Sequence, residues 1–149
     1  MKTPMVTLML AALTVSACVK EQVVVPARSN TGVGPALVIE RFMRAVNTEP
    51  KDLATMGQLF GTKDGPIGER DSRAQVEQRM FAIATVLHHD DYEIVREQQV
   101  PGRTSEATQL LVRVTAGQKS HNVPFTMVRY KDSSWLIEQI GIDVITNQR

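Results

Sequence analysis

The chain has 149 residues, 42% of them hydrophobic and 22% charged, a composition that indicates one globular domain and excludes a disordered or fibrous protein. Seventeen Lys and Arg residues balance sixteen Asp and Glu residues, and no basic run concentrates the positive charge. Because binding to a phosphate backbone requires a local excess of Lys and Arg, this balance argues against nucleic acid as a partner.

The N-terminal segment predicts export. Lys2 supplies a short positive region, and residues 5–15 (MVTLMLAALTV) form an uncharged, mildly apolar run. This run is shorter than the roughly 20 apolar residues of a membrane-spanning helix, but it suits the apolar core of a signal peptide. Residues 1–17 are therefore predicted to be a signal peptide.

The single cysteine follows this run directly. The sequence Val15-Ser16-Ala17-Cys18 resembles the bacterial lipobox, and the resemblance implies cleavage before Cys18 and acylation of this residue with diacylglyceryl and palmitate chains. Each buried CH₂ group contributes about 0.8 kcal/mol, so several chains hold a protein to a membrane stably. The alternative is an ordinary cysteine in an uncleaved leader. Val19 is not the Asp that favours inner-membrane retention, so we expect the periplasmic face of the outer membrane.

Residues 18–34 are predicted to be a lipidated N-terminus and flexible tether, and residues 35–149 to be one domain. Val23 to Val25 have the character of an edge strand, but Pro26 ends it, and residues 27–34 (ARSNTGVG) are small, polar and glycine-bearing. No cysteine remains for a disulfide, so the domain depends on its core for stability.

The first half of the domain predicts three helices. Gly34-Pro35 opens the first helix, a second runs from about Lys51 to Phe60, and a third runs from about Arg73 to His88 after a cap at Asp71 or Ser72. Each carries apolar residues at helical spacing. Residues 62–69 (TKDGPIGE) contain three helix breakers and predict a loop with Ile67 exposed, either as a plain connection or against a ligand.

The second half changes to a period of two, which predicts strands over residues 92–100, 107–116, 121–131 and 135–145. Short turns join them. We therefore expect an α+β domain in which three N-terminal helices pack on a curved four-stranded antiparallel sheet. About 110 residues in this arrangement bury a sufficient core.

Residues 127–140 (MVRYKDSSWLIEQI) form a strand, a polar turn and a strand that starts with Trp135. Helices followed by a sheet that ends in such a hairpin resemble the nuclear transport factor 2-like superfamily, over about Gly34 to Ile145. The resemblance implies a cone whose open end forms an apolar pocket. It also implies that Trp135 packs in the core near the start of the last strand, as large aromatic residues mostly do.

Some members of this superfamily are ketosteroid isomerases or small dehydratases, whose sites need a carboxylate or His base and a Tyr donor. The candidates here are Asp143 on the last strand with Tyr92 or Tyr130. No spacing singles them out, the isomerase pattern is not recognisable, and a solvated Asp143 near a strand end is the alternative. Tyr92, Tyr130, Trp135 and Asp143 are thus candidate pocket residues, and no catalytic residue is assigned.

His88-His89-Asp90-Asp91 brings four metal-ligating residue types together, but neighbouring helical side chains point in different directions. Histidine at a helix C-terminus and an acidic turn account for the run, so neither a metal nor another cofactor is expected. His121 is expected to be exposed near a strand start.

These features predict a non-enzymatic, membrane-tethered periplasmic module for ligand binding or envelope assembly. Its expected partners are the membrane, a protein or second copy of the chain, or a small apolar ligand. The alternative is an isomerase- or dehydratase-like enzyme acting on a small hydrophobic carbonyl compound in the cone pocket.

Overall fold

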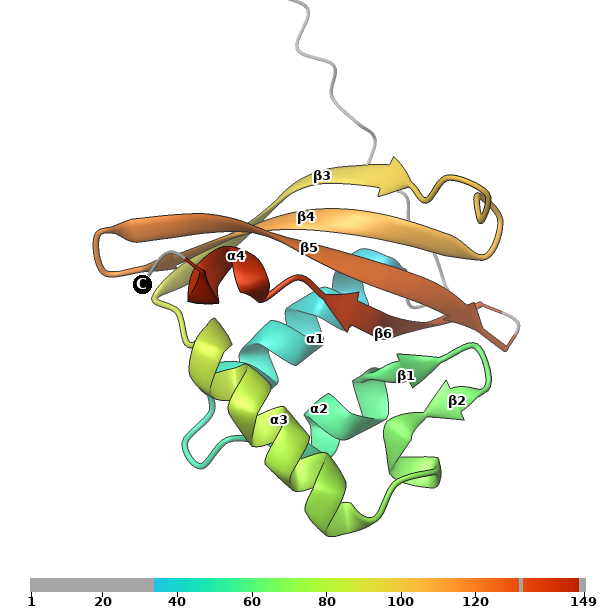
Figure 1. Cartoon of the computed structure of the whole chain (residues 1–149), viewed down its shortest axis with the longest axis horizontal. Coiled ribbons are helices and arrows are strands. Elements are labelled where there is room, and N and C mark those ends of the chain that lie inside the picture. Colours follow the sequence, from blue (N-terminus) through green and yellow to red (C-terminus); the bar gives the residue numbers. More distant parts are fainter. Residues whose placement is uncertain (1–33, 132, 148–149) are drawn as a thin grey trace, which may run out of the picture.

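The computed structural model describes residues 34–131 and 133–147, so the predicted signal peptide, Cys18 and residues 19–33 lie outside it. The helices are α1 (Pro35–Asn47), α2 (Leu53–Leu59), α3 (Arg73–Leu87), α4 (Asp143–Thr146) and the 3₁₀ helix η1 (Ile67–Glu69). The strands are β1 (Gly61–Thr62), β2 (Gly65–Pro66), β3 (Asp91–Gln99), β4 (Ala107–Ala116), β5 (Lys119–Tyr130) and β6 (Ser134–Ile140) (Figure 1).

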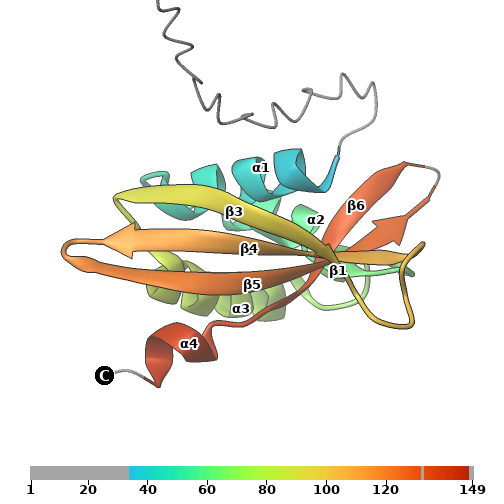
Figure 2. The same cartoon turned by 90° about the horizontal axis from the view of Figure 1, so that it is seen from above.

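The predicted α+β class and four-stranded antiparallel sheet are confirmed. The strand order is β3-β4-β5-β6, and each strand pairs antiparallel with the next. Helices α1, α2 and α3 lie on one face of this sheet (Figure 1); seen from above, α3 lies behind the strands and much of α1 is visible beyond the edge of β3 (Figure 2). The register shifts at Val95 of β3 and at Glu138 of β6, where one extra residue bends each strand.

The main core lies between the sheet and these helices. The alternation predicted for β4 is confirmed, because Leu110, Val112 and Val114 are buried whereas Arg113 between them is exposed. Side chains fill the space between helices and strands, and the largest fully buried ones include Phe42, Met43, Met80, Leu87 and Phe125. The rings of Phe42 and Phe125 meet edge to face with centroids 6.4 Å apart, a favourable aromatic geometry.

A second, smaller buried cluster lies on the other face of the sheet. Ala107, Val128 and Leu136 are register partners on three neighbouring strands, and each is at most 4% exposed. They lie outside the main core cluster, as expected for residues that alternate with inward-facing ones. Above this face the β3–β4 connection is held by Arg103, which forms an ion pair with Glu138 of β6.

Local signals in the sequence determine where the helices start. Ser72, one of the two predicted caps, begins α3 through a capping box in which its hydroxyl accepts from the Gln75 N–H and the Gln75 side chain accepts from the Ser72 N–H. Asp52 caps α2 by accepting from the Thr55 N–H at 3.0 Å. Both contacts satisfy backbone donors that have no partner within the helix.

The predicted loop over residues 62–69 is wrong. Strands β1 and β2 form a small hairpin that continues into η1, and Ile67, expected to be exposed, is only 3% exposed. The hairpin forms because Gly65 adopts a φ of 135°, which only glycine takes without strain. It is then held against the edge of the sheet, since Phe60 bridges Ile137 of β6.

The predicted extent of the last strand is also wrong. Strand β6 ends at Ile140, and Asp143, which was placed on that strand, is instead the exposed first residue of α4. The strand ends because Gly141 turns the chain across β5, where its N–H donates to the Pro124 carbonyl at 2.9 Å. A Cβ at Gly141 would lie 2.6 Å from Pro124 Cγ, so this crossing requires glycine.

Candidate functional site

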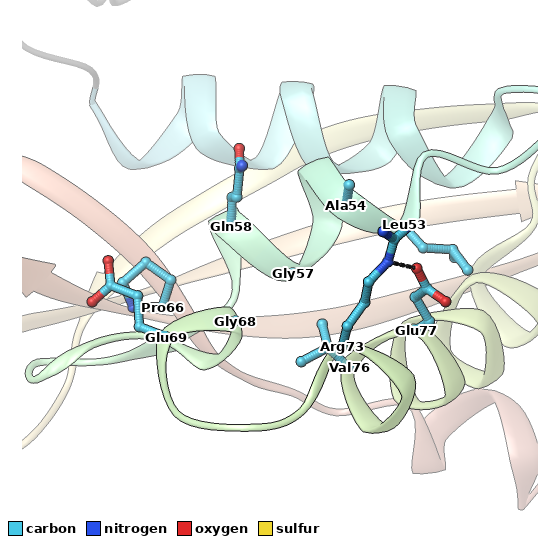
Figure 3. Close-up of a pocket in the computed structure, with 10 residues that line it drawn as sticks. All are labelled: Leu53, Ala54, Gly57, Gln58, Pro66, Gly68, Glu69, Arg73, Val76 and Glu77. Carbon is cyan, nitrogen blue, oxygen red and sulfur yellow. Dashed lines mark hydrogen bonds and ion pairs between the residues drawn. The ribbon is translucent and has the colours of Figure 1, made fainter.

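A surface groove in the described part of the chain lies between α2, η1 and the start of α3. It has a volume of about 530 Å³, which is within the range of ligand sites. Its lining residues are Leu53, Ala54, Gly57, Gln58, Pro66, Gly68, Glu69, Arg73, Val76 and Glu77 (Figure 3). We call this surface the α2–α3 groove.

The floor of the α2–α3 groove exists because two helices cross closely. Gly57 of α2 is buried against Val76 of α3, and a Cβ at Gly57 would lie 2.6 Å from Val76 Cγ1. Only a residue without a side chain allows this approach. Leu53 and Ala54 on the preceding turn of α2 extend the same floor, so aliphatic carbon dominates its centre.

Charged groups stand at the ends of the groove. In Figure 3, Arg73 and Glu77 meet at one end, where Arg73 Nε donates to Glu77 Oε1 at 2.7 Å, and Pro66 and Glu69 lie at the other end. The hydrogen bond to Glu77, reinforced by its negative charge, raises the pKa of Arg73. An apolar centre with a polar rim is the anatomy of a protein interaction surface.

The second groove has a volume of about 410 Å³ and lies beside the β4–β5 turn. It is lined by Val86, Val114, Ala116, Lys119, Ser120, His121 and Ile145. His121, expected to be exposed, is half-buried here. Both polar and apolar side chains line this groove, and Thr115 Oγ1 and Ser120 Oγ share a hydrogen bond of 2.8 Å near it.

The structure does not bring the four candidate pocket residues together. Tyr92 on β3 lies in the register row of Val114 and His121, and His121 is nine residues before Tyr130 on β5. At about 3.3 Å per strand residue, the two tyrosines are therefore roughly 30 Å apart. Trp135 lies next to Tyr130 at the β5–β6 turn, whereas Asp143 is on α4. None of the four lines either groove.

Each tyrosine has its own surroundings. The Tyr92 ring meets the His89 ring at right angles with centroids 5.3 Å apart. Partial burial, followed by the negative charge of Glu40, raises the pKa of Tyr92. Tyr130 lies beneath the Lys131 ammonium, 4.8 Å from ring centroid to Nζ. Trp135 is half-buried against the core, as the packing interpretation expected, and lies under Arg129.

The His88 to Asp91 segment divides into separate structural roles. His89 is 5% exposed, and its Nδ1 lies 2.9 Å from the Leu87 carbonyl oxygen. Asp90 instead accepts from the Gly117 N–H at 2.6 Å. His88 is exposed. Over residues 34–131 and 133–147, no three His, Cys, Asp or Glu side chains gather as metal ligands would.

Sequence reasoning missed the α2–α3 groove. Its lining comes from two helices and from a segment predicted to be an irregular loop. One signal was available: Gly57 interrupts the apolar side of α2, and a glycine inside a helix costs about 1 kcal/mol relative to alanine unless packing requires it.

The helices that the structure describes include none long and apolar enough to cross a membrane. Comparison of the chain with protein-family models, with curated proteins and with solved structures finds no match.

Proposed function

We propose that this protein is a lipid-anchored module of the cell envelope that binds a partner protein through the α2–α3 groove without catalysing a reaction. The anchor is the acylated Cys18 on the periplasmic side, most favourably at the outer membrane. The domain that it tethers is similar to the nuclear transport factor 2-like superfamily. The partner inserts an apolar side chain between α2 and α3.

The proposed relationship to that superfamily is supported by the order of the elements. Three helices precede the sheet, a short hairpin separates the second helix from the third, and the last two strands form a hairpin with Trp135 near its turn. An isolated bridge from Phe60 to Ile137 places the small hairpin beside β6, next to the edge of the four-stranded sheet.

The groove's composition is the observation that carries the binding proposal. Leu53, Pro66 and Val76 offer carbon to an apolar side chain, and Glu69 and Arg73 at the rim offer hydrogen bonds to the backbone beside it. The interior beneath is already filled by fully buried residues such as Met56 and Met80. A partner therefore binds on the outside of the helices, where hot-spot side chains fill open depressions.

Site-specific photo-crosslinking in intact cells tests this proposal. A photoreactive amino acid at Ala54, an exposed residue in the groove, is expected to give one discrete adduct with an envelope protein. The adduct should disappear when Gln58→Trp, from the same helix, fills the groove. The matched probe at Ala82, exposed on α3 away from the groove, should not give this adduct.

Three outcomes of that experiment separate the alternatives. An adduct of twice the chain's own mass would replace the heterologous partner with a homodimer. Equal patterns from positions 54 and 82, or an adduct that survives Gln58→Trp, would overturn the groove as the binding surface. Mass spectrometry of the cellular protein tests the anchor separately, because an intact leader or an unmodified thiol at Cys18 would contradict it.

No observation in the described residues favours the isomerase or dehydratase alternative. That chemistry needs a base and a hydrogen-bond donor around one substrate, but Asp143 is exposed on α4 and the two tyrosines lie at opposite ends of the sheet. The small apolar ligand expected as an alternative partner would occupy the same groove. When added to cells, such a ligand would prevent formation of the Ala54 adduct.

A further inference from the structure

One end of the domain carries two cations stacked on two aromatic rings. The Arg129 guanidinium carbon lies 5.1 Å from the Trp135 ring centroid, and Lys131 Nζ lies 4.8 Å from that of Tyr130. Arg129 and Trp135 are register partners, and Tyr130 pairs with Ser134. The two stacked pairs are therefore neighbours at the β5–β6 turn, and we call them the aromatic–cation end.

Both cations are available to a binding partner. Arg129 and Lys131 are exposed, and within residues 34–131 and 133–147 neither forms an ion pair. The Tyr130 hydroxyl, together with the weaker influence of Glu69, raises the pKa of Lys131, so its ammonium stays charged at neutral pH. Arg103, near the same end, is already paired with Glu138.

Acidic residues keep the overall charge of this end small. Glu69 and Glu106 are exposed, and Glu106 lies close to Arg129, whose N–H donates to the Glu106 carbonyl at 2.7 Å. Long-range electrostatic attraction would therefore add little to the binding of a highly anionic surface. A surface that presents phosphates beside apolar groups binds more favourably, because the phosphates pair with the cations and the apolar groups contact the rings beneath them.

The N-terminal segment joins the domain in the same half. In Figures 1 and 2 α1 starts in the half of the long axis that carries the β5–β6 turn, and the β4–β5 turn lies at the opposite end. Leu37 on the first turn of α1 is 40% exposed. Cys18 precedes Gly34 by sixteen residues, which span at most about 55 Å when extended.

These residue types match the chemistry of a phospholipid surface. Tryptophan and tyrosine are enriched where an apolar ring meets water at a membrane interface. Arginine and lysine place their apolar stems beside such rings and extend their charged heads toward phosphates. A tether of sixteen residues that starts in this half of the domain leaves the stacked pairs within reach of the bilayer holding its acyl chains.

We propose that the aromatic–cation end rests on the phospholipid bilayer in which Cys18 is anchored. Arg129 and Lys131 bind lipid phosphates, and Leu37 and the exposed parts of Trp135 and Tyr130 contact the boundary between headgroups and acyl chains. The domain is thereby oriented, and the α2–α3 groove is held at a defined angle to the membrane. This proposal rests on the proposed lipid anchor and adds a second contact to it.

The single tryptophan makes the contact directly measurable. Because the chain contains one Trp, all tryptophan fluorescence of the acylated, purified full-length product comes from Trp135. In vesicles of phosphatidylethanolamine and phosphatidylglycerol, we expect quenching by lipids brominated near the glycerol backbone to exceed quenching by lipids brominated at the chain ends. Unquenched, red-shifted emission from correctly acylated protein would overturn the proposal.

A matched pair of double variants tests the role of the cations. Arg129→Ala with Lys131→Ala should reduce the quenching by about half or more, since each basic residue near a phosphate surface strengthens binding about fivefold. Arg96→Ala with Lys119→Ala removes the same charge from exposed residues on β3 and at the β4–β5 turn, and should leave quenching unchanged. Equal loss in both variants would contradict a specific contact.

The same preparation separates failure of the contact from failure of the anchor. Mass spectrometry reports acylation of Cys18, and fluorescence reports the position of Trp135. Acyl mass without quenching would overturn the contact and leave the anchor. If Cys18 lacks acyl chains, the unmodified chain is added to the same brominated vesicles. Quenching of Trp135 that is lost in the Arg129→Ala, Lys131→Ala variant would then support the contact without the anchor.

Discussion

Asn47 and His89, 42 residues apart in the chain, are joined by two reciprocal hydrogen bonds. Asn47 Nδ2 donates to the His89 carbonyl at 2.7 Å, and the His89 N–H donates to Asn47 Oδ1 at 3.4 Å. Asn47 is the last residue of α1, and His89 lies between α3 and β3. One side chain therefore fixes the end of the first helix to the point where the chain enters the sheet.

Replacing this side chain should destabilise the domain. Asn47→Ala removes both hydrogen bonds and leaves backbone groups of a residue that is 5% exposed without partners, so urea denaturation should show a loss of about 1–2 kcal/mol. Asn122→Ala is the control, because Asn122 is exposed on β5 and should stay within about 0.5 kcal/mol of the original protein. Equal effects would contradict the Asn47 contact as the cause.

Gly57→Ala should destabilise the protein although alanine is the better helix former by about 1 kcal/mol. Its Cβ would lie 2.6 Å from Val76 Cγ1, so α2 and α3 must separate at a cost of about 1–3 kcal/mol. Val76→Ala in the same chain should recover part of this loss in a double-mutant cycle. Gly68→Ala is the control, because nothing lies within 4 Å of a Cβ added there. If the changes in the free energy of unfolding at positions 57 and 76 are simply additive, the clash is contradicted.

The cap of α2 should contribute a pH-dependent part of the stability. The Thr55 side chain and then the Thr55 N–H lower the pKa of Asp52. Because the pKa is lower in the folded than in the unfolded state, this stabilisation is present above the unfolded value and is lost as the pH falls through the folded value, below about pH 4.

Asp52→Asn measures this contribution, since asparagine also caps helices but carries no charge. At about pH 6 the original protein should be more stable by about 0.3–1 kcal/mol, and the difference should vanish under acid conditions in urea denaturation curves. Asp64→Asn removes the same charge from an exposed residue between β1 and β2. An equally large trend in Asp64→Asn would rule out the helix cap as its source.

The Arg103 to Glu138 ion pair should couple the β3–β4 connection to β6. Arg103 donates through Nη1 at 2.7 Å and Nη2 at 3.2 Å to the two carboxylate oxygens of Glu138, and this hydrogen bonding raises the pKa of Arg103. A double-mutant cycle with Arg103→Ala and Glu138→Ala should give a coupling of about 0.5–1 kcal/mol that decreases in high salt.

The reference for that cycle is the Arg73 to Glu77 pair, in which the arginine side chain is 92% exposed. Its coupling should be smaller, about 0.3–0.5 kcal/mol. Thermal unfolding of the four chains in each cycle provides both values. A coupling for Arg103 and Glu138 no larger than that of the exposed pair would show that the bidentate contact adds nothing to the stability of the β3–β4 connection.

The spacing of apolar residues and the residue types that favour local hydrogen bonds made much of the fold predictable. The strand β4 was recognised because Leu110 and Val112 alternate with exposed or half-exposed residues, and this alternation follows from the strand geometry itself. A cap at Asp71 or Ser72 was predictable because both residue types favour helix N-caps, and the structure shows that Ser72 caps α3 together with Gln75. Both signals are contained in a few neighbouring residues and do not depend on the rest of the chain.

The elements that were mispredicted depend on distant partners. Residues 62–69 contain the breakers of a loop, yet they form a hairpin around Gly65, which is held in place because Phe60 bridges Ile137 and Ile67 packs in the core. The last strand has enough β propensity to continue, but Gly141 crosses Pro124 and diverts the chain into α4. Neither contact is visible in the local sequence.

The sequence by itself determined the α+β class, the antiparallel strand order and the balanced charge of the chain, because periodicity, turn residues and composition act over short stretches. Only the tertiary structure decided which side chains meet. It brought Gly57 against Val76 to form the α2–α3 groove, it stacked Arg129 on Trp135 near the β5–β6 turn, and it kept Tyr92 far from Tyr130. Such contacts arise from helix crossings and strand register, which are settled by packing of the whole domain.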